Sequence, residues 1–332
     1  MRSRRKLPAR PAKPVDTNIV RGAAAPLTTP PKGATVCREG CTIQKLIYEN
    51  LHGETAVFFH APWVLGRVKG VGMSDVKVVA AEGAYQQGES ITGLRREGRT
   101  VKVTLHLLAP SQQEMYRLRA ELLGVLSPDK AFDGTRRARL LYENDFGRRW
   151  TWAVPESGLD WGERKQNAQP SLSLNFRCES PYWYGMTRQE AVFKAKKAGF
   201  TLPMKMPLGL GSKSFVCQVD SAGNAEAPAE IEITGAGEMP TLVNESTGEK
   251  ICLVQPLPEG DTLVLDTDPA RLKVRIRHGD GSEENGFGYL SPESSVAEFG
   301  LRPGENLLHY VPQGDGSRSV IRVRWYDCWE GV

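Results

Sequence analysis

The sequence predicts a mainly β protein with two domains: an α+β N-terminal domain, made of a β-sandwich and one packed helix, and a C-terminal β-sandwich. Three observations favour this class. The 34 glycines and 22 prolines make up 56 of the 332 residues, about 17% where about 12% is usual, and both residues mark turns. Apolar and polar side chains alternate in several short runs, which is the period of a half-buried strand. Only one segment has the apolar spacing of a long helix.

Residues 1–41 are predicted to form a basic, proline-rich arm. The first 36 residues contain eight Lys or Arg and a single acid, Asp16, a net charge of +7, which leaves −3 of the total of +4 for the rest of the chain. Six prolines in this stretch lack an amide donor, so it suits neither a helix interior nor a central strand. Two interpretations stay open, a flexible terminus or an arm that docks on a neighbouring subunit or an anionic surface. For the second, the candidate contact residues are Arg2, Arg4, Arg5, Lys6, Arg10 and Lys13.

Residues 42–190 are predicted to be the first folded domain. Short apolar runs between turn signals predict strands at 43–48, 55–59, 63–71, 75–81, 101–107, 137–142, 148–154 and 171–178. In the run 101–107 the odd positions are apolar and the even ones polar, so that His106 falls on the solvent face and needs no catalytic explanation. Asn and Gly within residues 143–147 suit a hairpin turn between two of these strands.

One helix is predicted at residues 111–126. Ser111 and Glu114 have the spacing of a capping box, in which each side chain can accept a hydrogen bond from an unpaired backbone amide. Pro128 disfavours helical geometry at the residue before it and ends the helix. An apolar stripe follows the cap at helical spacing: Met115, Leu118, Leu122 and Val125. We expect this stripe to pack on the sheet.

Residues 191–212 are predicted to be a linker, because lysines, prolines and glycines alternate there without apolar periodicity. The remainder, 213–332, contains apolar runs at intervals of about eight to twelve residues, which is typical of a β-sandwich. The expected strands include 215–219, 230–234, 262–266, 272–277 and 320–326.

The six cysteines are scattered along the chain, and no apolar run reaches the ~18 residues that a membrane helix needs. The basic N-terminus lacks the apolar segment of a secretory signal, so we expect reduced thiols and no membrane insertion. Cys37 and Cys41 have no second close pair of ligands nearby, which argues against a zinc site.

No segment of the sequence has the residue spacing of a known catalytic motif. The strongest candidates are the carboxylates Glu156, Asp160 and Glu163, which lie near Trp150, Trp152 and Trp161 in the sequence. A glycoside hydrolase needs two carboxyl groups across a cleft, whereas residues 155–158 are typical of a turn and the tryptophans are typical of core or interface anchors. The sequence therefore predicts no enzyme, no cofactor site and no metal site.

The order of several segments resembles the distal tail protein family of long-tailed, non-contractile bacteriophages. The matching pieces are 46–50, 88–90, 96–99, 111–126, 141–145, 176–183, 227–233, 244–248, 260–261, 266–267 and 301–306. They extend over about residues 43–332, and their order and spacing carry the resemblance. The basic arm has no counterpart in the family pattern.

The resemblance implies a ring-forming, tail-tube-like β domain at 42–190 and a galectin-like β-sandwich at 213–332. It implies a structural virion protein at the distal end of the phage tail, assembled in the cytoplasm of the bacterial host. In this interpretation six copies form a ring that joins the tail tube to the tail tip or baseplate and the host-recognition apparatus.

The implied partners are the chain itself, as a homo-hexamer, and the other proteins of the tail. These are the tail tube protein, the tape measure protein, the tail tip hub or tail-associated protein, and receptor-binding or tail fibre proteins. DNA would pass through the lumen of the ring without specific binding. The alternative is a lectin-like β-sandwich protein that contacts glycans of the host surface, although the fold alone does not establish sugar binding.

Overall fold

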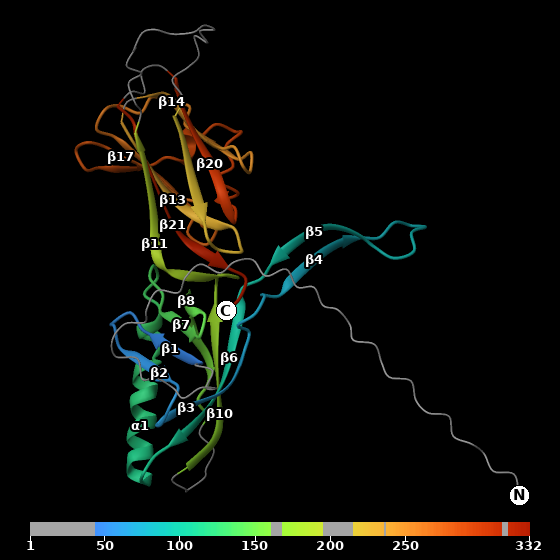
Figure 1. Cartoon of the computed structure of the whole chain (residues 1–332), viewed down its shortest axis with the longest axis vertical. Coiled ribbons are helices and arrows are strands. Elements are labelled where there is room, and N and C mark those ends of the chain that lie inside the picture. Colours follow the sequence, from blue (N-terminus) through green and yellow to red (C-terminus); the bar gives the residue numbers. More distant parts are fainter. Residues whose placement is uncertain (1–43, 161–167, 195–214, 236, 314–317) are drawn as a thin grey trace, which may run out of the picture. The chain divides into compact units, whose positions relative to one another are not determined.

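The computed structural model describes residues 44–160, 168–194, 215–235, 237–313 and 318–332. Within these residues the chain is mainly β, as the sequence predicts, and nearly all of its strands pair antiparallel (Figure 1). The predicted arm at 1–41 and most of the predicted linker at 191–212 lie outside the described residues.

The N-terminal part contains two four-stranded arrays. In the first, the order is β2-β1-β7-β8, with β1 at Lys45–Glu49, β2 at Thr55–Phe58, β7 at Arg139–Asn144 and β8 at Gly147–Trp152. In the second, the order is β3-β6-β10-β9, with β3 at Trp63–Lys69, β6 at Arg99–Leu108, β9 at Val154–Gly158 and β10 at Ala168–Cys178. The predicted turn at 143–147 is confirmed, since Asn144 pairs with Gly147 at the end of the β7–β8 hairpin.

The predicted helix forms as α1, Gln112–Val125, and the short helix α2, Pro128–Ala131, follows it. The capping box is half realised: the hydroxyl of Ser111 accepts a hydrogen bond from the backbone amide of Glu114, at 3.1 Å. The carboxylate of Glu114 instead accepts hydrogen bonds from the Arg117 side chain. The apolar stripe of α1 joins the strands in one core, with members Met115, Leu118, Leu122, Leu46, Phe58, Val103, Leu105, Leu174 and Phe176.

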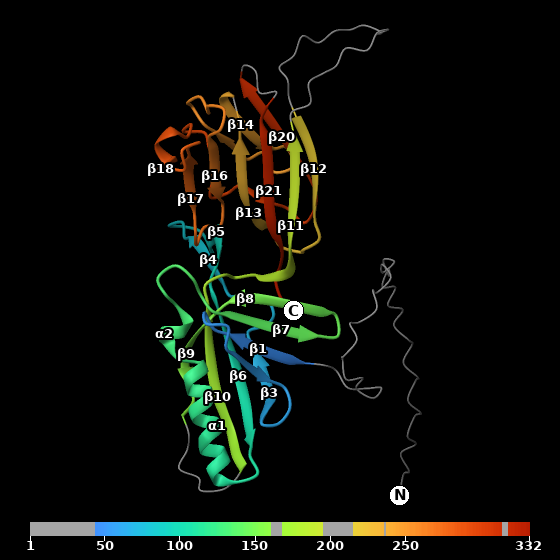
Figure 2. The ribbon, with the colours of Figure 1, turned by 90° about the vertical axis from the view of Figure 1, so that its left-hand side faces the viewer.

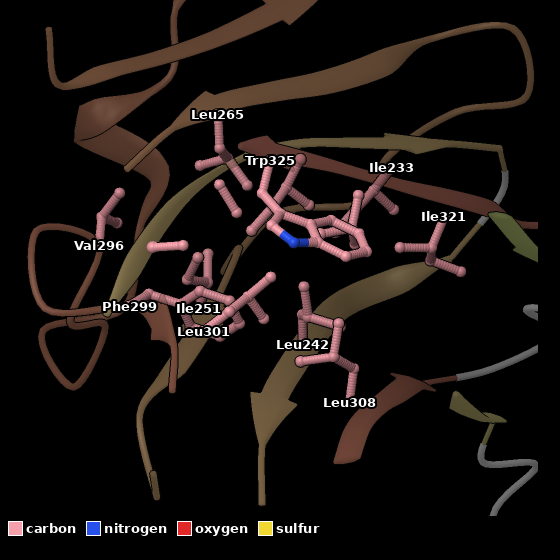
Figure 3. Close-up of a cluster of buried hydrophobic side chains, with 14 of the residues drawn as sticks. Ile233, Leu242, Ile251, Leu265, Val296, Phe299, Leu301, Leu308, Ile321 and Trp325 are labelled. Atoms are coloured by element: carbon pink, nitrogen blue, oxygen red, sulfur yellow. The ribbon is translucent and has the colours of Figure 1, made fainter. Parts of the chain in front are cut away.

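The C-terminal part is a β-sandwich. One sheet contains β12 (Phe215–Ser221), β20 (Gly304–Gln313), β14 (Glu238–Asn244) and β15 (Lys250–Cys252) in that order. The other contains β18 (Glu283–Asn285), β17 (Lys273–Arg277), β16 (Thr262–Asp266), β13 (Ala227–Thr234) and β21 (Val320–Trp329), with β19 (Gly300–Leu301) beside β13. The 3-10 helix η1, Phe287–Tyr289, lies between β18 and β19 in the chain. Side chains from both sheets meet in the core that Figure 3 shows, among them Ile233, Leu242, Leu265, Leu308, Ile321 and Trp325.

One strand belongs to both parts. β11, Trp183–Lys194, lies between β21 and β8 (Figure 2). It pairs with β8 through Tyr184 and Gly185 and with β21 through Trp183, Tyr184 and Arg188–Lys194, so that a single sheet runs from β18 to β2. A register shift between Tyr184 and Arg188 interrupts the pairing of β11 with β21. The predicted domain end at residue 190 and the start of the predicted linker at residue 191 therefore fall inside a paired strand, and the division into domains stays a prediction.

The segment 155–158 was predicted to be a turn, and this prediction is wrong. It is part of the strand β9, which pairs with β10 at the edge of its sheet. Pro155 is compatible with an edge strand because a missing amide donor costs nothing on the unpaired side.

Candidate functional site

The described residues bring together three features that bear on function: an arginine-centred junction, an aromatic hollow beside it, and a β-hairpin that is exposed on both faces. The junction is built around Arg99, the first residue of β6, whose side chain is 3% exposed. Its Nη1 donates hydrogen bonds to the carbonyl oxygens of Gly72, at 2.8 Å, and Gly70, at 3.3 Å. Its Nη2 donates to the carbonyl oxygens of Glu330, at 2.9 Å, and Pro181. One side chain thus ties together three segments that are far apart in the sequence.

The four carbonyl acceptors explain how a guanidinium tolerates burial. Burial lowers the pKa of Arg99 from its ordinary value, and the carboxylate of Glu330 acts in the opposite direction. A buried charge is costly unless it is paired and hydrogen-bonded, and here the backbone supplies the partners.

Further contacts strengthen the same junction. Arg149, on β8, stacks over the ring of Trp329 with its guanidinium carbon 4.3 Å from the ring centroid, and it donates to the carbonyl oxygen of Gly331. The backbone amide of Val332 donates to the carbonyl oxygen of Val71 at 3.1 Å. Residues 329–332 are therefore anchored on the N-terminal part of the chain.

The aromatic hollow lies where β8 and β11 meet the C-terminal sheet. Trp150 packs against Trp152, Tyr184 and Tyr326, with ring centroids 4.7, 4.9 and 5.4 Å away. Its indole Nε1 donates to the carbonyl oxygen of Gly185 at 2.8 Å. These tryptophans, which the sequence placed near possible catalytic carboxylates, instead pack in the contact between the two parts.

The charged groups that line this hollow are largely paired with one another. Arg271 donates to the carboxylate of Asp268 at 2.9 Å and lies over Trp152 at 5.9 Å. Arg188 pairs with Glu230 in the same wall. Burial raises the pKa of Asp266, the acid whose oxygen accepts a hydrogen bond from the backbone amide of residue 268. These ion pairs and ring contacts hold the walls of the hollow together.

The carboxylates that the sequence singled out do not converge on this hollow. Glu156 is an exposed residue of β9, Asp160 is exposed after it, and Glu163 lies outside the described residues, as does Trp161. Apart from Trp150 and Trp152, the residues that line the hollow were missed by sequence reasoning, because they come from β11, β13, β16, β21 and the loop between β16 and β17.

The candidate arm contacts Arg2, Arg4, Arg5, Lys6, Arg10 and Lys13 also lie outside the described residues, together with Cys37 and Cys41. In the described ranges, His, Cys, Asp and Glu nowhere gather in groups of three or more that could hold a metal ion. None of the helices in these ranges is long and apolar enough to cross a membrane.

The exposed hairpin consists of β4, Val76–Ala81, and β5, Ser90–Arg96, which pair only with each other among the described strands. Figure 1 shows it as a two-stranded ribbon beside the label of the C-terminus. Val78 is paired with Leu94, and Ala80 with Ile91, so these four side chains share one face. An apolar face of this kind is unusual on a free surface.

Known proteins resemble this chain in part of its sequence and in its fold. Residues 222–329 match the family described as the siphovirus-type tail component, C-terminal domain (SPP1_Dit). No curated protein matches the sequence significantly.

Among solved structures, the crystal structure of the SPP1 Dit (gp 19.1) protein, a hub of the adsorption apparatus in phages of Gram-positive hosts, is similar with a TM-score of 0.56. The identity is 13%, over 85% of this chain and 98% of that one. Two structures of the phage p2 baseplate in its activated conformation, with Ca and with Sr, each give a TM-score of 0.45 at 13% identity, over 86% of this chain and 98% of theirs. At this identity the SPP1 Dit likeness shows the fold.

The resemblance to distal tail proteins that the segment order indicated is thereby confirmed, and residues 222–329 of the chain match the siphovirus-type tail component family.

Proposed function

We propose that this protein is a structural component of a siphophage tail, a distal adaptor that closes into a ring of six copies and joins the tail tube to the tail tip or baseplate. The observation that carries the proposal is the tail-component match at 222–329 in a chain whose fold follows SPP1 Dit over 85% of its length. The junction around Arg99 supports this proposal, since an adaptor needs its two ends to be fixed relative to each other.

The proposed partners are the chain itself, the tail tube protein, the tape measure protein, the tail tip hub and receptor-binding or tail fibre proteins. DNA would pass through the ring without specific binding, and the protein would reside in the virion after assembly in the host cytoplasm. The galectin-like character of the C-terminal sandwich and a role in host attachment are part of the same proposal. The paired charges of the aromatic hollow support a non-enzymatic role.

The test is the mass of the purified full chain by light scattering, combined with negative-stain images of the same fraction. Six copies of the 36.6 kDa chain give a particle of about 220 kDa, and cyclic closure predicts a central hole. A monodisperse monomer at all concentrations would contradict the ring. A glycan array on the same sample would then decide whether the protein is a carbohydrate-binding sandwich instead.

A further inference from the structure

The hairpin of β4 and β5 gathers exposed apolar side chains to an unusual degree. Of the nineteen large hydrophobic residues that are exposed in the described chain, six fall within residues 73–94. They are Met73, Val78, Val79, Tyr85, Ile91 and Leu94. Because single exposed hydrophobics are ordinary whereas contiguous ones mark interaction sites, this concentration points to a docking element.

The apolar face is formed by Val78, Ala80, Ile91 and Leu94, of which Ile91 is 64% and Leu94 69% exposed. The opposite face carries Lys77 and Arg95 directly across from each other. A two-stranded hairpin alone is at best marginally stable in water. The ribbon therefore gains stability when its apolar face is covered by something else.

The base of the hairpin is held firmly. Arg96 forms an ion pair with Glu330 at 2.6 Å, and the backbone amide of Glu97 donates to the carbonyl oxygen of Asp75 at 2.9 Å. Arg99 fixes the segment that leads into β4 through its bonds to Gly70 and Gly72. An element that is fixed before binding loses less conformational entropy when it docks.

The charges at the tip of the hairpin, residues 82–89, indicate the charge of the surface that it binds. Glu82 and Glu89 are exposed there, no Lys or Arg lies between residues 77 and 95, and neither glutamate forms an ion pair within the described residues. On β3 and β6, Lys69 and Lys102 are exposed and lie directly opposite each other. Like charges in this position repel, so an approaching carboxylate is favoured.

The same face of β6 also offers apolar contact. Side chains alternate along the strand, so that Leu108, which is 47% exposed, lies on the side of Lys102. One side of the body of the protein thus presents a lysine pair and an apolar residue, and the hairpin presents an acidic tip and an apolar face.

We propose that the β4–β5 hairpin docks on the β3–β6 face of a second copy of this chain, with its apolar face covered and the carboxylates of Glu82 and Glu89 beside Lys69 and Lys102. The inference rests on the proposed ring, because a closed ring requires each subunit to present two different, complementary patches. Docking of one hairpin on another hairpin would be a two-fold contact and would stop at the dimer.

The first experiment compares the oligomeric mass of the full chain with that of the double variant Ile91→Ser/Leu94→Ser. The matched control is Val192→Ser/Leu307→Ser, which removes apolar side chains of the sandwich that are 46% and 41% exposed. We expect the control to keep the wild-type mass. We expect the hairpin variant to dissociate at concentrations at least about tenfold higher than the wild type, because it lacks two apolar side chains that the interface would bury.

Retention of the wild-type mass by the hairpin variant would overturn the inference and leave the ring intact. A monomeric wild type would overturn the ring and the inference with it, so the two failures are distinguishable. We expect each variant to stay folded, because the substituted side chains are exposed. Thermal unfolding of each variant checks this.

The second experiment tests, by charge reversal, whether the β3–β6 face of the second copy binds the hairpin. Glu82→Lys/Glu89→Lys and Lys69→Glu/Lys102→Glu should each weaken assembly, because like charges then face each other across the interface. The two variants mixed in equal amounts should assemble into alternating rings that contain both chains. Failure of the mixture to assemble better than either variant alone would overturn the assignment of the β3–β6 face.

Discussion

The guanidinium of Arg99 lies over the indole ring of Trp183, with its central carbon 5.4 Å from the ring centroid. Arg99 begins β6 and Trp183 begins β11, the strand that continues into the C-terminal sandwich. This stacking, together with the carbonyl contacts of Arg99, places the base of the hairpin, the start of β11 and residues 329–332 around one side chain.

Replacing Arg99 should therefore destabilise the whole protein. We expect Arg99→Met to lower the free energy of unfolding by about 2–4 kcal/mol, because four carbonyl oxygens lose a charged donor in a site closed to water. Urea unfolding followed by tryptophan fluorescence measures the change. Arg95→Met, at an exposed position two residues before Glu97, is the control, and equal stability of both variants would refute the role of Arg99.

Two glycines should respond in opposite directions to alanine. A Cβ at Gly223 would clash with the carbonyl oxygen of Cys328 and approach its amide nitrogen to 2.7 Å, so Gly223→Ala should cost at least about 2 kcal/mol. A Cβ at Gly124, in α1, meets no atom within 4 Å, so Gly124→Ala should stabilise by about 0.5–1 kcal/mol. Thermal melting of both variants against the wild type measures these changes. Any stabilisation by Gly223→Ala would contradict the packing around Cys328.

The stability contribution of Asp266 should depend on pH. Burial raises the pKa of this carboxyl in the folded protein, so ionisation costs more in the folded than in the unfolded state. The penalty is absent below the unfolded pKa of about 4 and fully present above the folded pKa. Asp266→Asn should therefore stabilise the protein at pH 7 and lose that advantage at pH 3, as urea unfolding at both values can show. An advantage that grows on acidification would contradict this sign.

The cysteines should differ in their reactivity toward alkylating agents. Burial raises the pKa of the Cys178 thiol to about 12, and burial raises the pKa of Cys328 as well. Since the thiolate is the reactive form, both should stay unmodified in the folded protein at pH 8 and react after denaturation. Cys252 is partly exposed and should be labelled first among these three. Peptide mass spectrometry assigns each site, and rapid labelling of Cys178 under native conditions would argue against its burial.

Much of the fold could be predicted from local patterns. The alternation at 101–107 and the capping box at Ser111 predicted β6 and α1, because side-chain period and helix caps depend only on near neighbours in the chain. Strand β9 was mistaken for a turn because Pro155 and Gly158 are typical of turns. Both residues are also compatible with an edge strand, and the sequence alone does not distinguish the two.

The candidate sites depended on contacts that no local pattern contains. The strand β4 was predicted, but its isolation with β5 and the exposure of Ile91 and Leu94 follow from the absence of a third strand beside them in the described residues. The tryptophans at 150 and 152 were expected in a core or interface. Only the pairing of β8 with β11 shows that they pack in the contact between the two parts.

By itself the sequence determined the strand and helix periods, the cap of α1, the separation of a basic arm from a slightly acidic body, and the resemblance to the distal tail proteins. The tertiary structure alone decided that β11 links both parts in one sheet, that Arg99 is the centre of their junction, and that the hairpin has an uncovered apolar face. The physical reason is the distance along the chain over which each effect acts. Backbone propensity and periodicity act over a few residues, whereas burial and strand pairing join residues such as Arg99 and Glu330 that are 231 positions apart.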